Sequence, residues 1–242
     1  AGIFEPPPRS PAQPSVTLII DDVGEDFDLL RDLQRIHIPL TVSILPDTRY
    51  SKQSAEWAYQ HGMEIMVHLP MEPIGYPAED PGRDALMNRM NRSQIQTRTE
   101  ELLNAVPHAV GTNNHMGSRF TENSSKMNDV LDIVARDHFY FIDSRTIASS
   151  VGYQVALEKG VPAGERTLFL DDIHDHESIQ ARFDELVNAA RRDGHAIGIC
   201  HLRPQTIATL EQMKIADYTD VKFSFASDAV SSGVAARDSR GR

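Results

Sequence analysis

The chain has 242 residues, with 24 Lys and Arg against 35 Asp and Glu, so its formal net charge at pH 7 is −11. This charge argues against a nucleic-acid-binding protein, because neutralising phosphates requires clustered Lys and Arg. The length suits one large domain, the hydrophobic content of 40% is enough for a sizeable core, and neither a membrane span nor a signal-peptide core is visible in the sequence.

The two ends of the chain differ in composition from its middle. Residues 1–15 are Pro-rich and aperiodic, which predicts an extended arm or linker. Residues 229–242 are small and polar, which predicts a disordered tail. Residues 16–228 are expected to form a single domain between these ends. The single cysteine, Cys200, excludes an intrachain disulfide.

The first half of the domain alternates apolar strand patterns with helical patterns. Strands are predicted at 16–21, 40–45 and 64–69, separated by helices at 26–36 and 51–61. Residues 70–92 have no clear period, so a long loop that borders the site is expected there. Ser93 is then expected as the N-cap of a helix that runs to about Val106.

The same alternation continues through the second half. Strands are predicted at 108–114, 139–143, 167–172, 196–201 and 221–226, and helices up to about residue 137, at 176–192 and at 206–215. Strands that are apolar on both faces indicate a parallel sheet covered by helices. The number of units predicts an α/β protein with a closed or nearly closed barrel of about seven parallel strands, an open doubly wound sheet being the alternative.

Polar side chains gather where the predicted strands end. Along the chain, these strand-end residues are Asp21, Asp22, His68, Asn113, Asn114, His115, Asp143, Asp171, Asp172 and His201. In a parallel barrel all these ends lie on one face, which is the face that carries active sites. Two histidines and an aspartate suit a divalent metal such as zinc, and a further carboxylate and histidine could move protons beside it.

Six segments place the chain near a known family. In order, IIDDVG, HLPMEP, NNHMGS, FIDSRT, LFLDD and GICHLRPQT resemble the divergent polysaccharide deacetylase family, a distant branch of the NodB-like carbohydrate esterases, over roughly residues 15–226. The resemblance implies an irregular (β/α) barrel and a divalent metal, with zinc as the first choice. It implies that Asp21 is the catalytic base and His201 the catalytic acid. It also implies that Asp22 and His68 bind the metal.

One position departs from the family's H-x-x-x-H motif. Glu72 stands where the second histidine is expected, in HLPME. Either His115 from the next strand or the Glu72 carboxylate could replace that imidazole. Pro70 and Pro73 constrain the segment around Glu72, so His115 is favoured as the third ligand. The residues expected to contact substrate or to support the site are Glu72, Asn114, Asp143, Arg145 and Asp171, although Asp143 and Arg145 fit a structural ion pair equally well.

Two functions from different classes follow from this pattern. The first is a metal-dependent hydrolase that removes an N-acetyl or other acyl group from a cell-envelope carbohydrate. The alternative is a catalytically inactive carbohydrate-binding envelope protein on the same fold, which the altered motif favours. Phosphoryl transfer fits less well, because Val23 stands where that chemistry commonly has a second acid. The resemblance implies an extracytoplasmic location, while the sugar and the oligomeric state stay open.

Overall fold

The computed structural model describes residues 13–231. The predicted arm and tail therefore lie outside the described residues, except for 13–15 and 229–231. Ser15 is already the first residue of a strand, and Ser231 forms an antiparallel bridge with Ala163. Within the described part of the chain, no helix is both long and apolar enough to cross a membrane.

Nine strands form one parallel sheet. They are β1 (Ser15–Val23), β2 (Thr41–Ile44), β3 (Glu64–Met71), β4 (Gly111–Met116), β5 (Tyr140–Asp143), β6 (Ala163–Glu165), β7 (Leu168–Phe169), β8 (His195–His201) and β9 (Lys222–Ser224). The order is β6-β5-β4-β3-β2-β1-β8-β7, and β9 also pairs with β1. Among the described residues no ladder joins β6 to β7, so the sheet is a half-barrel that strand pairing does not close. The predicted irregular (β/α) barrel is confirmed.

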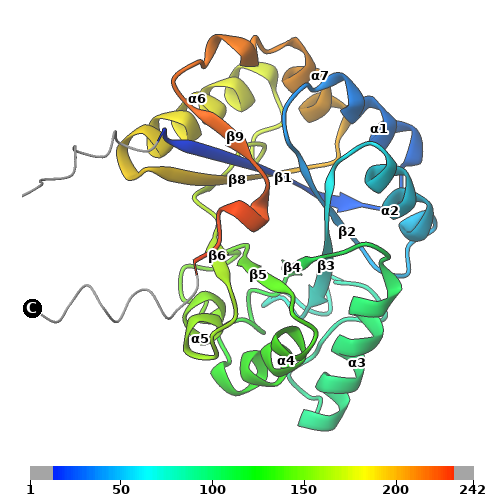
Figure 1. Ribbon diagram of the computed structural model, residues 1–242. Coiled ribbons are helices and arrows are strands. Elements are labelled where there is room, and N and C mark those ends of the chain that lie inside the picture. The colour runs from blue at the N-terminus through cyan, green and yellow to red at the C-terminus, as the bar shows by residue number, and fades with distance from the viewer. Residues whose placement is uncertain (1–12, 232–242) are drawn as a thin grey trace, which may run out of the picture.

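Helices surround the strands on the outside (Figure 1). They are α1 (Phe27–Asp32), α2 (Ser51–Gln60), α3 (Arg92–Ala105), α4 (Ser124–Arg136), α5 (Gly152–Glu158), α6 (His176–Asp193) and α7 (Pro204–Gln212), with the short 3-10 helices η1 (Leu33–Arg35), η2 (Ile215–Asp217) and η3 (Ala226–Asp228). The N-cap of α3 is Asn91 and not Ser93 as predicted. Asn91 and Gln94 bond to each other's backbone N–H in a capping box, which satisfies two free donors at the helix start.

Each strand divides its side chains between the inside and the outside of the half-barrel. The outward side chains of β1 and β3, among them Leu18 and Val67, pack in the large core cluster between strands and helices. The inward ones belong to a smaller cluster, which contains Ile19, Met66, Tyr140, Ile142, Ile197, Ile199 and Ala226. Because side chains alternate along a strand, the residues two positions after Ile19, Met66 and Ile199 also face inward. These residues are Asp21, His68 and His201.

The C-terminal segment covers the end of the half-barrel where the strands begin, and Figure 1 shows it in orange and red, crossing in front of the strands. The backbone N–H of Ala226 donates to Thr41 Oγ1 at 3.0 Å, and that of Ser227 donates to Glu64 Oε1 at 3.0 Å. Tyr140 Oη donates to the same Glu64 oxygen at 2.8 Å. Burial and the Glu64 charge raise the pKa of the Tyr140 phenol well above its ordinary value. This end is therefore closed by packing and hydrogen bonds.

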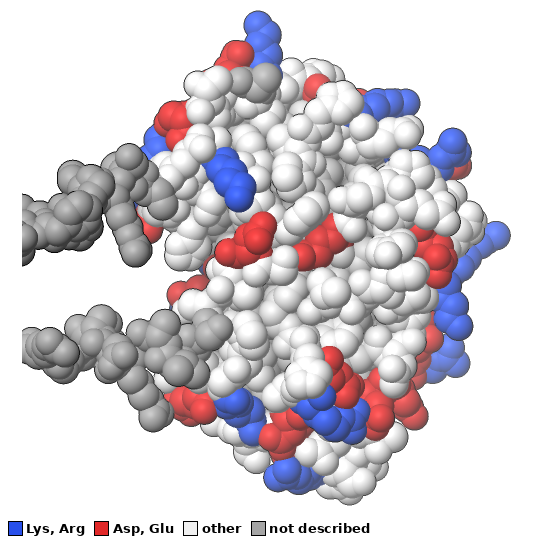
Figure 2. Space-filling model, in the orientation of Figure 1, with Lys and Arg blue, Asp and Glu red and all other residues white. Residues whose placement is uncertain are grey.

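The face of the molecule that is seen in Figures 1 and 2 carries charges of both signs. Figure 2 shows acidic side chains in the middle of the face and basic side chains mainly near its edge. The described residues form no large basic patch on this side of the molecule, which agrees with the excess of acidic residues in the sequence.

Candidate active site

Three donor atoms converge where β1, β3 and β4 end. Asp22 Oδ1 lies 3.0 Å from His115 Nδ1 and 3.3 Å from His68 Nε2. The two imidazole nitrogens lie 3.1 Å from each other. Donors bound to one zinc ion at tetrahedral angles stand about 3.3 Å apart. This group, which we call the donor triangle, has the size that one divalent metal requires.

The chemistry of the donor triangle also fits a cation. Asp22 Oδ1 is buried and has no hydrogen-bond partner of suitable geometry among the described residues, and leaving such an oxygen unsatisfied costs about 1–3 kcal/mol. Burial alone would raise the pKa of Asp22, but the imidazoles of His115 and His68 hold that pKa far below its ordinary value. Asp22 is therefore ionised. One carboxylate and two imidazoles match the ligand preference of zinc.

The backbone at the end of β1 explains how two adjacent carboxylates face the same place. Asp22 has a φ of 60°, in the left-handed region, and the register between β1 and β2 shifts in the same stretch, between Ile20 and Val23. A left-handed conformation is uncommon for a residue with a side chain and costs free energy. Here it breaks the strict alternation of the strand, so that both Asp21 and Asp22 lie beside His68.

Asp21 lies next to the donor triangle and is almost fully buried. Its Oδ2 is 3.6 Å from His68 Nε2, and its Oδ1 accepts a hydrogen bond from Asn113 Nδ2 at 2.9 Å. Burial raises the pKa of Asp21 and outweighs the lowering by His68 and His201. A carboxylate with a raised pKa, adjacent to a metal site, is suited to accept a proton at neutral pH.

Two residues of the site were missed by the sequence interpretation. Asn113 was noted only as a strand-end residue, and Ser43 was given no role. The structure shows that Asn113 Oδ1 accepts hydrogen bonds from Ser43 Oγ at 2.6 Å and from His68 Nδ1 at 2.7 Å. The alternation along β4 could have indicated Asn113, because it shares the inward face with His115.

His201 is oriented by a buried carboxylate. Its Nδ1 donates to Asp171 Oδ1 at 2.9 Å, and its backbone N–H donates to Asp171 Oδ2 at 2.9 Å. Thr206 Oγ1 donates to the same Oδ2 at 2.8 Å. Burial opposes both charges, but the mutual hydrogen bond prevails: it lowers the pKa of Asp171 and raises the pKa of His201. The imidazole also stacks on Phe169, with ring centroids 5.6 Å apart.

Glu72 does not enter the donor triangle. Its Oε2 accepts a hydrogen bond from the backbone N–H of Asn88 at 2.6 Å, and its Oε1 lies 3.3 Å from Arg119 Nη1. Of the two alternatives for the third ligand, the structure therefore places His115, and not Glu72, beside Asp22 and His68. Glu72 instead ties the loop after β3 to the turn after β4.

Three of the predicted supporting residues make contacts with the backbone and with a neighbouring strand. The side chains of Asn114 and Asp143 lie on the opposite face of their strands from the inward residues. Asn114 Oδ1 accepts a hydrogen bond from the backbone of Ser144 at 2.9 Å, and Asp143 Oδ1 accepts one from the backbone of Arg145 at 2.9 Å. Arg145 Nη1 pairs with Glu165 at 3.2 Å. These contacts brace the turn after β5, which fits the supporting role expected for these residues; the guanidinium of Arg145 pairs with Glu165 and not with Asp143.

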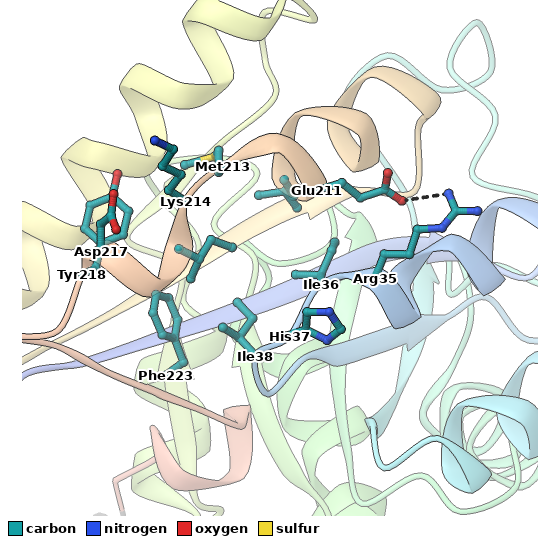
Figure 3. A pocket seen from close by; sticks show the side chains of 12 residues that line it. Arg35, Ile36, His37, Ile38, Glu211, Met213, Lys214, Asp217, Tyr218 and Phe223 are labelled. Atoms are coloured by element: carbon teal, nitrogen blue, oxygen red, sulfur yellow. Dashed lines mark hydrogen bonds and ion pairs between the residues drawn. The ribbon is translucent and has the colours of Figure 1, made fainter.

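A pocket of about 470 Å³ lies at the other end of the sheet, between residues 35–38 and 210–223. Figure 3 shows apolar side chains such as Ile36, Ile38 and Phe223 along it, with an ion pair between Arg35 and Glu211 at its edge. None of the donor-triangle residues lines this pocket. Its apolar lining differs in kind from the polar strand ends that carry the donor triangle.

The half-barrel and the polar groups at its strand ends define an α/β protein of the NodB-like fold with a candidate metal centre. Residues 18–230 match the family described as divergent polysaccharide deacetylase. The chain belongs to this family, and the resemblance seen in its six sequence segments is confirmed.

Two relatives share much of the sequence. A protein of Haemophilus influenzae is 36% identical over 203 residues, which cover 83% of this chain and 71% of that protein. YibQ of Escherichia coli is 34% identical over 199 residues, which cover 82% of this chain and 61% of YibQ. Both relatives are described as uncharacterized, so they support the family and name no activity.

Solved structures support the fold. A protein of Agrobacterium tumefaciens C58, also described as uncharacterized, has a TM-score of 0.85 at 24% identity, with 90% of this chain and 89% of that chain covered. The catalytic domain of a peptidoglycan N-acetylglucosamine deacetylase from Eubacterium rectale has a TM-score of 0.53 at 11% identity, covering 92% and 94%. A CE4 family pseudoenzyme from Bacillus anthracis has a TM-score of 0.50 at 13% identity, covering 90% and 66%. These likenesses establish the architecture alone.

Proposed function

We propose that the protein is a metal-dependent hydrolase that removes an N-acetyl group from a carbohydrate of the cell envelope. The observation that carries this proposal is the donor triangle, flanked by a buried carboxylate and by an imidazole held on a second carboxylate. Family membership supports a glycan as the substrate class. The E. rectale neighbour is named as a peptidoglycan N-acetylglucosamine deacetylase, which suggests the first substrates to try.

Each group in the site has a distinct task. Asp22, His68 and His115 would hold the metal. A divalent metal bound there supplies a Lewis acid that polarises the amide carbonyl and lowers the pKa of water. Asp21 accepts the proton of the attacking water, because its carboxylate is ionisable, buried and adjacent to His68.

His201 donates the proton that the departing amine requires. The C–N bond of the N-acetyl group breaks, acetate leaves, and the nitrogen takes a proton to become the free amine. Asp171 engages Nδ1 of His201, so the proton is delivered from Nε2. The raised pKa of His201 keeps the imidazolium populated closer to neutral pH, as an acid catalyst requires.

The test is acetate release from N-acetylglucosamine oligomers and from peptidoglycan fragments. Metal-stripped protein should release none, and addition of Zn²⁺, Co²⁺ or Mn²⁺ should restore release. Asp21→Asn, which keeps the size of the side chain, should stay inactive with every metal. Acetate release that is unaffected by metal removal would contradict the proposal.

A non-catalytic carbohydrate-binding function is the second candidate. It is favoured by Glu72, which stands in the place of a histidine and is engaged with Asn88 and Arg119, and by the pseudoenzyme among the structures of this fold. Retention of glycan fragments by the parent without acetate release would support it. We further propose an extracytoplasmic location, where envelope glycans lie, and fractionation of cells that make the natural protein tests this.

A further inference from the structure

We propose that Ser43 and Asn113 form a positioning relay that fixes the tautomer of His68 and the orientation of Asp21 at the same time. The inference rests on the proposed function, because it assigns His68 as a metal ligand and Asp21 as the base. Neither relay residue belongs to the donor triangle, and neither would touch the metal. The relay acts through the two residues that it holds.

The orientation of the Asn113 amide is determined by its surroundings. Asn113 and Ser43 are fully buried, so each polar atom needs a protein partner. One end of the amide faces Ser43 Oγ at 2.6 Å and His68 Nδ1 at 2.7 Å, and the other end faces Asp21 Oδ1 at 2.9 Å. A carboxylate accepts and cannot donate. The NH₂ group must therefore face Asp21, and the oxygen faces Ser43 and His68.

This orientation fixes the proton of His68. An amide oxygen only accepts hydrogen bonds, so His68 Nδ1 carries the proton that it donates to Asn113. In the neutral imidazole, Nε2 then keeps its lone pair, and Nε2 is the atom that faces Asp22 at 3.3 Å and His115 at 3.1 Å. A hydrogen bond from the ring nitrogen that does not face the metal sets the tautomer of a histidine ligand and raises its affinity for the metal.

The same amide fixes Asp21. Its NH₂ group holds Asp21 Oδ1, which leaves Oδ2 on the side of His68 Nε2. The neutral side chain of Asn113 thus accepts a hydrogen bond from His68 through its oxygen and donates one to Asp21 through its nitrogen. An aspartate in this position could still accept from His68, but its second oxygen would lie close to the Asp21 carboxylate. Two such carboxylates share a proton and cannot both act as bases.

The two ends of the amide can be separated by mutation. Asn113→Asp keeps the acceptor for His68 and removes the donor to Asp21, whereas Asn113→Leu removes both at similar volume. We expect Asn113→Asp to bind Co²⁺ within a few-fold of the parent and to lose about two orders of magnitude in kcat. Asn113→Leu should lower the Co²⁺ affinity by about 10–100-fold. Affinity is read from the visible absorption of Co²⁺ in the full chain, and kcat from acetate release.

Ser43 supplies an independent test. Ser43→Ala removes one of the two donors that hold the amide oxygen, so the affinity for Co²⁺ should fall several-fold. Ser43→Thr keeps the hydroxyl and should restore affinity. The matched control is Asn104→Asp, the same change at an exposed position of α3, which should leave Co²⁺ affinity at the parental value. Circular dichroism and thermal unfolding identify any variant that fails to fold.

The difference in Co²⁺ affinity between Asn113→Asp and Asn113→Leu decides the inference. If the two variants lose affinity equally, or if neither loses any, the relay is overturned. A parent that binds no Co²⁺ overturns it as well. Should the difference appear while the parent releases acetate from no glycan, the relay stands and only the proposed hydrolase function fails.

Discussion

Asp21 and Asp22 are neighbours in the chain, but their carboxylates have different surroundings. Asp22 is partly exposed and lies between two imidazoles, which lower its pKa, whereas Asp21 is buried and has a raised pKa. The positive φ of Asp22 brings both carboxylates beside His68, although only Asp21 is buried. In the proposed mechanism the pair therefore divides metal binding and proton transfer between two residues of the same chemical type.

Substitutions of Asp21 and Asp22 should impair different properties of the protein. Asp22→Ala should lose the metal, because one of three protein ligands is gone. Asp21→Asn should retain the metal and the fold but lose about two to four orders of magnitude in turnover, the usual contribution of a positioned base. Metal content and acetate release are measured side by side. The exposed Asp172 supplies the control, since Asp172→Ala should change neither quantity.

Asp171→Asn tests the acid through the pH dependence of the rate. The Asp171 carboxylate raises the pKa of His201, and the acid must be protonated to act. Removing the charge lowers that pKa, so activity should be lost at a lower pH and the alkaline limb of the kcat profile should move toward acid. The maximal rate should also fall by about 10–100-fold. An alkaline limb that stays at the parental pH would show that His201 is not the titrating acid.

At the scale of elements, the loop after β3 is ordered by the strand that it leaves. Leu86 forms a parallel bridge with Met71, and the backbone N–H of Leu86 donates to Pro70 O at 2.8 Å. Glu72 adds its bonds to Asn88 and Arg119. The aperiodic sequence predicted a long loop here, but these bonds hold it against the end of the sheet.

Glu72→Ala should loosen this loop without removing the metal. Losing a buried carboxylate acceptor costs about 1–3 kcal/mol, so amide exchange around Asn88 should accelerate by about tenfold or more. The affinity for Co²⁺ should stay at the parental value, because Glu72 lies outside the donor triangle. Hydrogen exchange and Co²⁺ titration measure the two effects. Glu79→Ala, an exposed change in the same loop, is the control, and a loss of Co²⁺ affinity on Glu72→Ala alone would make Glu72 a ligand after all.

Much of the element order could be predicted because the strands are continuous apolar runs with helical patterns between them. The same apolar runs did not show which side chains face the inside of the half-barrel. In β1 and β3 both faces of the strand are apolar, so alternation alone does not show which residues point inside. In β4 the polar residues gave a usable signal that was missed, because Asn113 shares its face with His115. The short strand β6 was missed, because a segment of three residues carries no measurable period, and β7 covers only two residues of the strand predicted at 167–172.

The donor triangle was accessible from the sequence for a different reason. Parallel strands bring their carboxyl ends to one face, so polar residues at those ends meet whatever the details of the packing. Ser43 gave no such signal, because it lies within a short strand and resembles an ordinary buried hydroxyl. Its role depends on a contact with Asn113, 70 residues away in the chain.

At the scale of the whole molecule, the two ends of the half-barrel are built differently. The end where the strands begin is covered by residues 222–231, and Ala226 packs in the inner apolar cluster. The opposite end carries the charged and polar groups of the site. Apolar residues between the two ends, such as Ile19 and Met66, separate the site from the closed end. The packing that closes the half-barrel and the polar groups of the site therefore lie at opposite ends of the same strands.

Ala226→Asn should destabilise the fold without changing the site. The new amide would be buried in the apolar inner cluster, at a cost of about 1–3 kcal/mol. Ser227→Asn changes the next residue, which is exposed, and should cost only a few tenths of a kcal/mol. Urea unfolding compares the two variants, and Co²⁺ affinity should remain parental in both. Equal destabilisation by the two substitutions would show that the inner packing of η3 does not hold this end closed.

The positions of Ser15 and Ser231 have a practical consequence for handling the protein. Ser15 begins β1, and Ser231 bridges to Ala163, the first residue of β6. Both residues therefore lie at the end of the sheet opposite the donor triangle. A sensor chip, resin or display scaffold coupled close to either of these residues would leave the donor triangle turned toward the bulk solution. Long glycan chains could then be tested in flow over an immobilised layer in which the molecules present the same side.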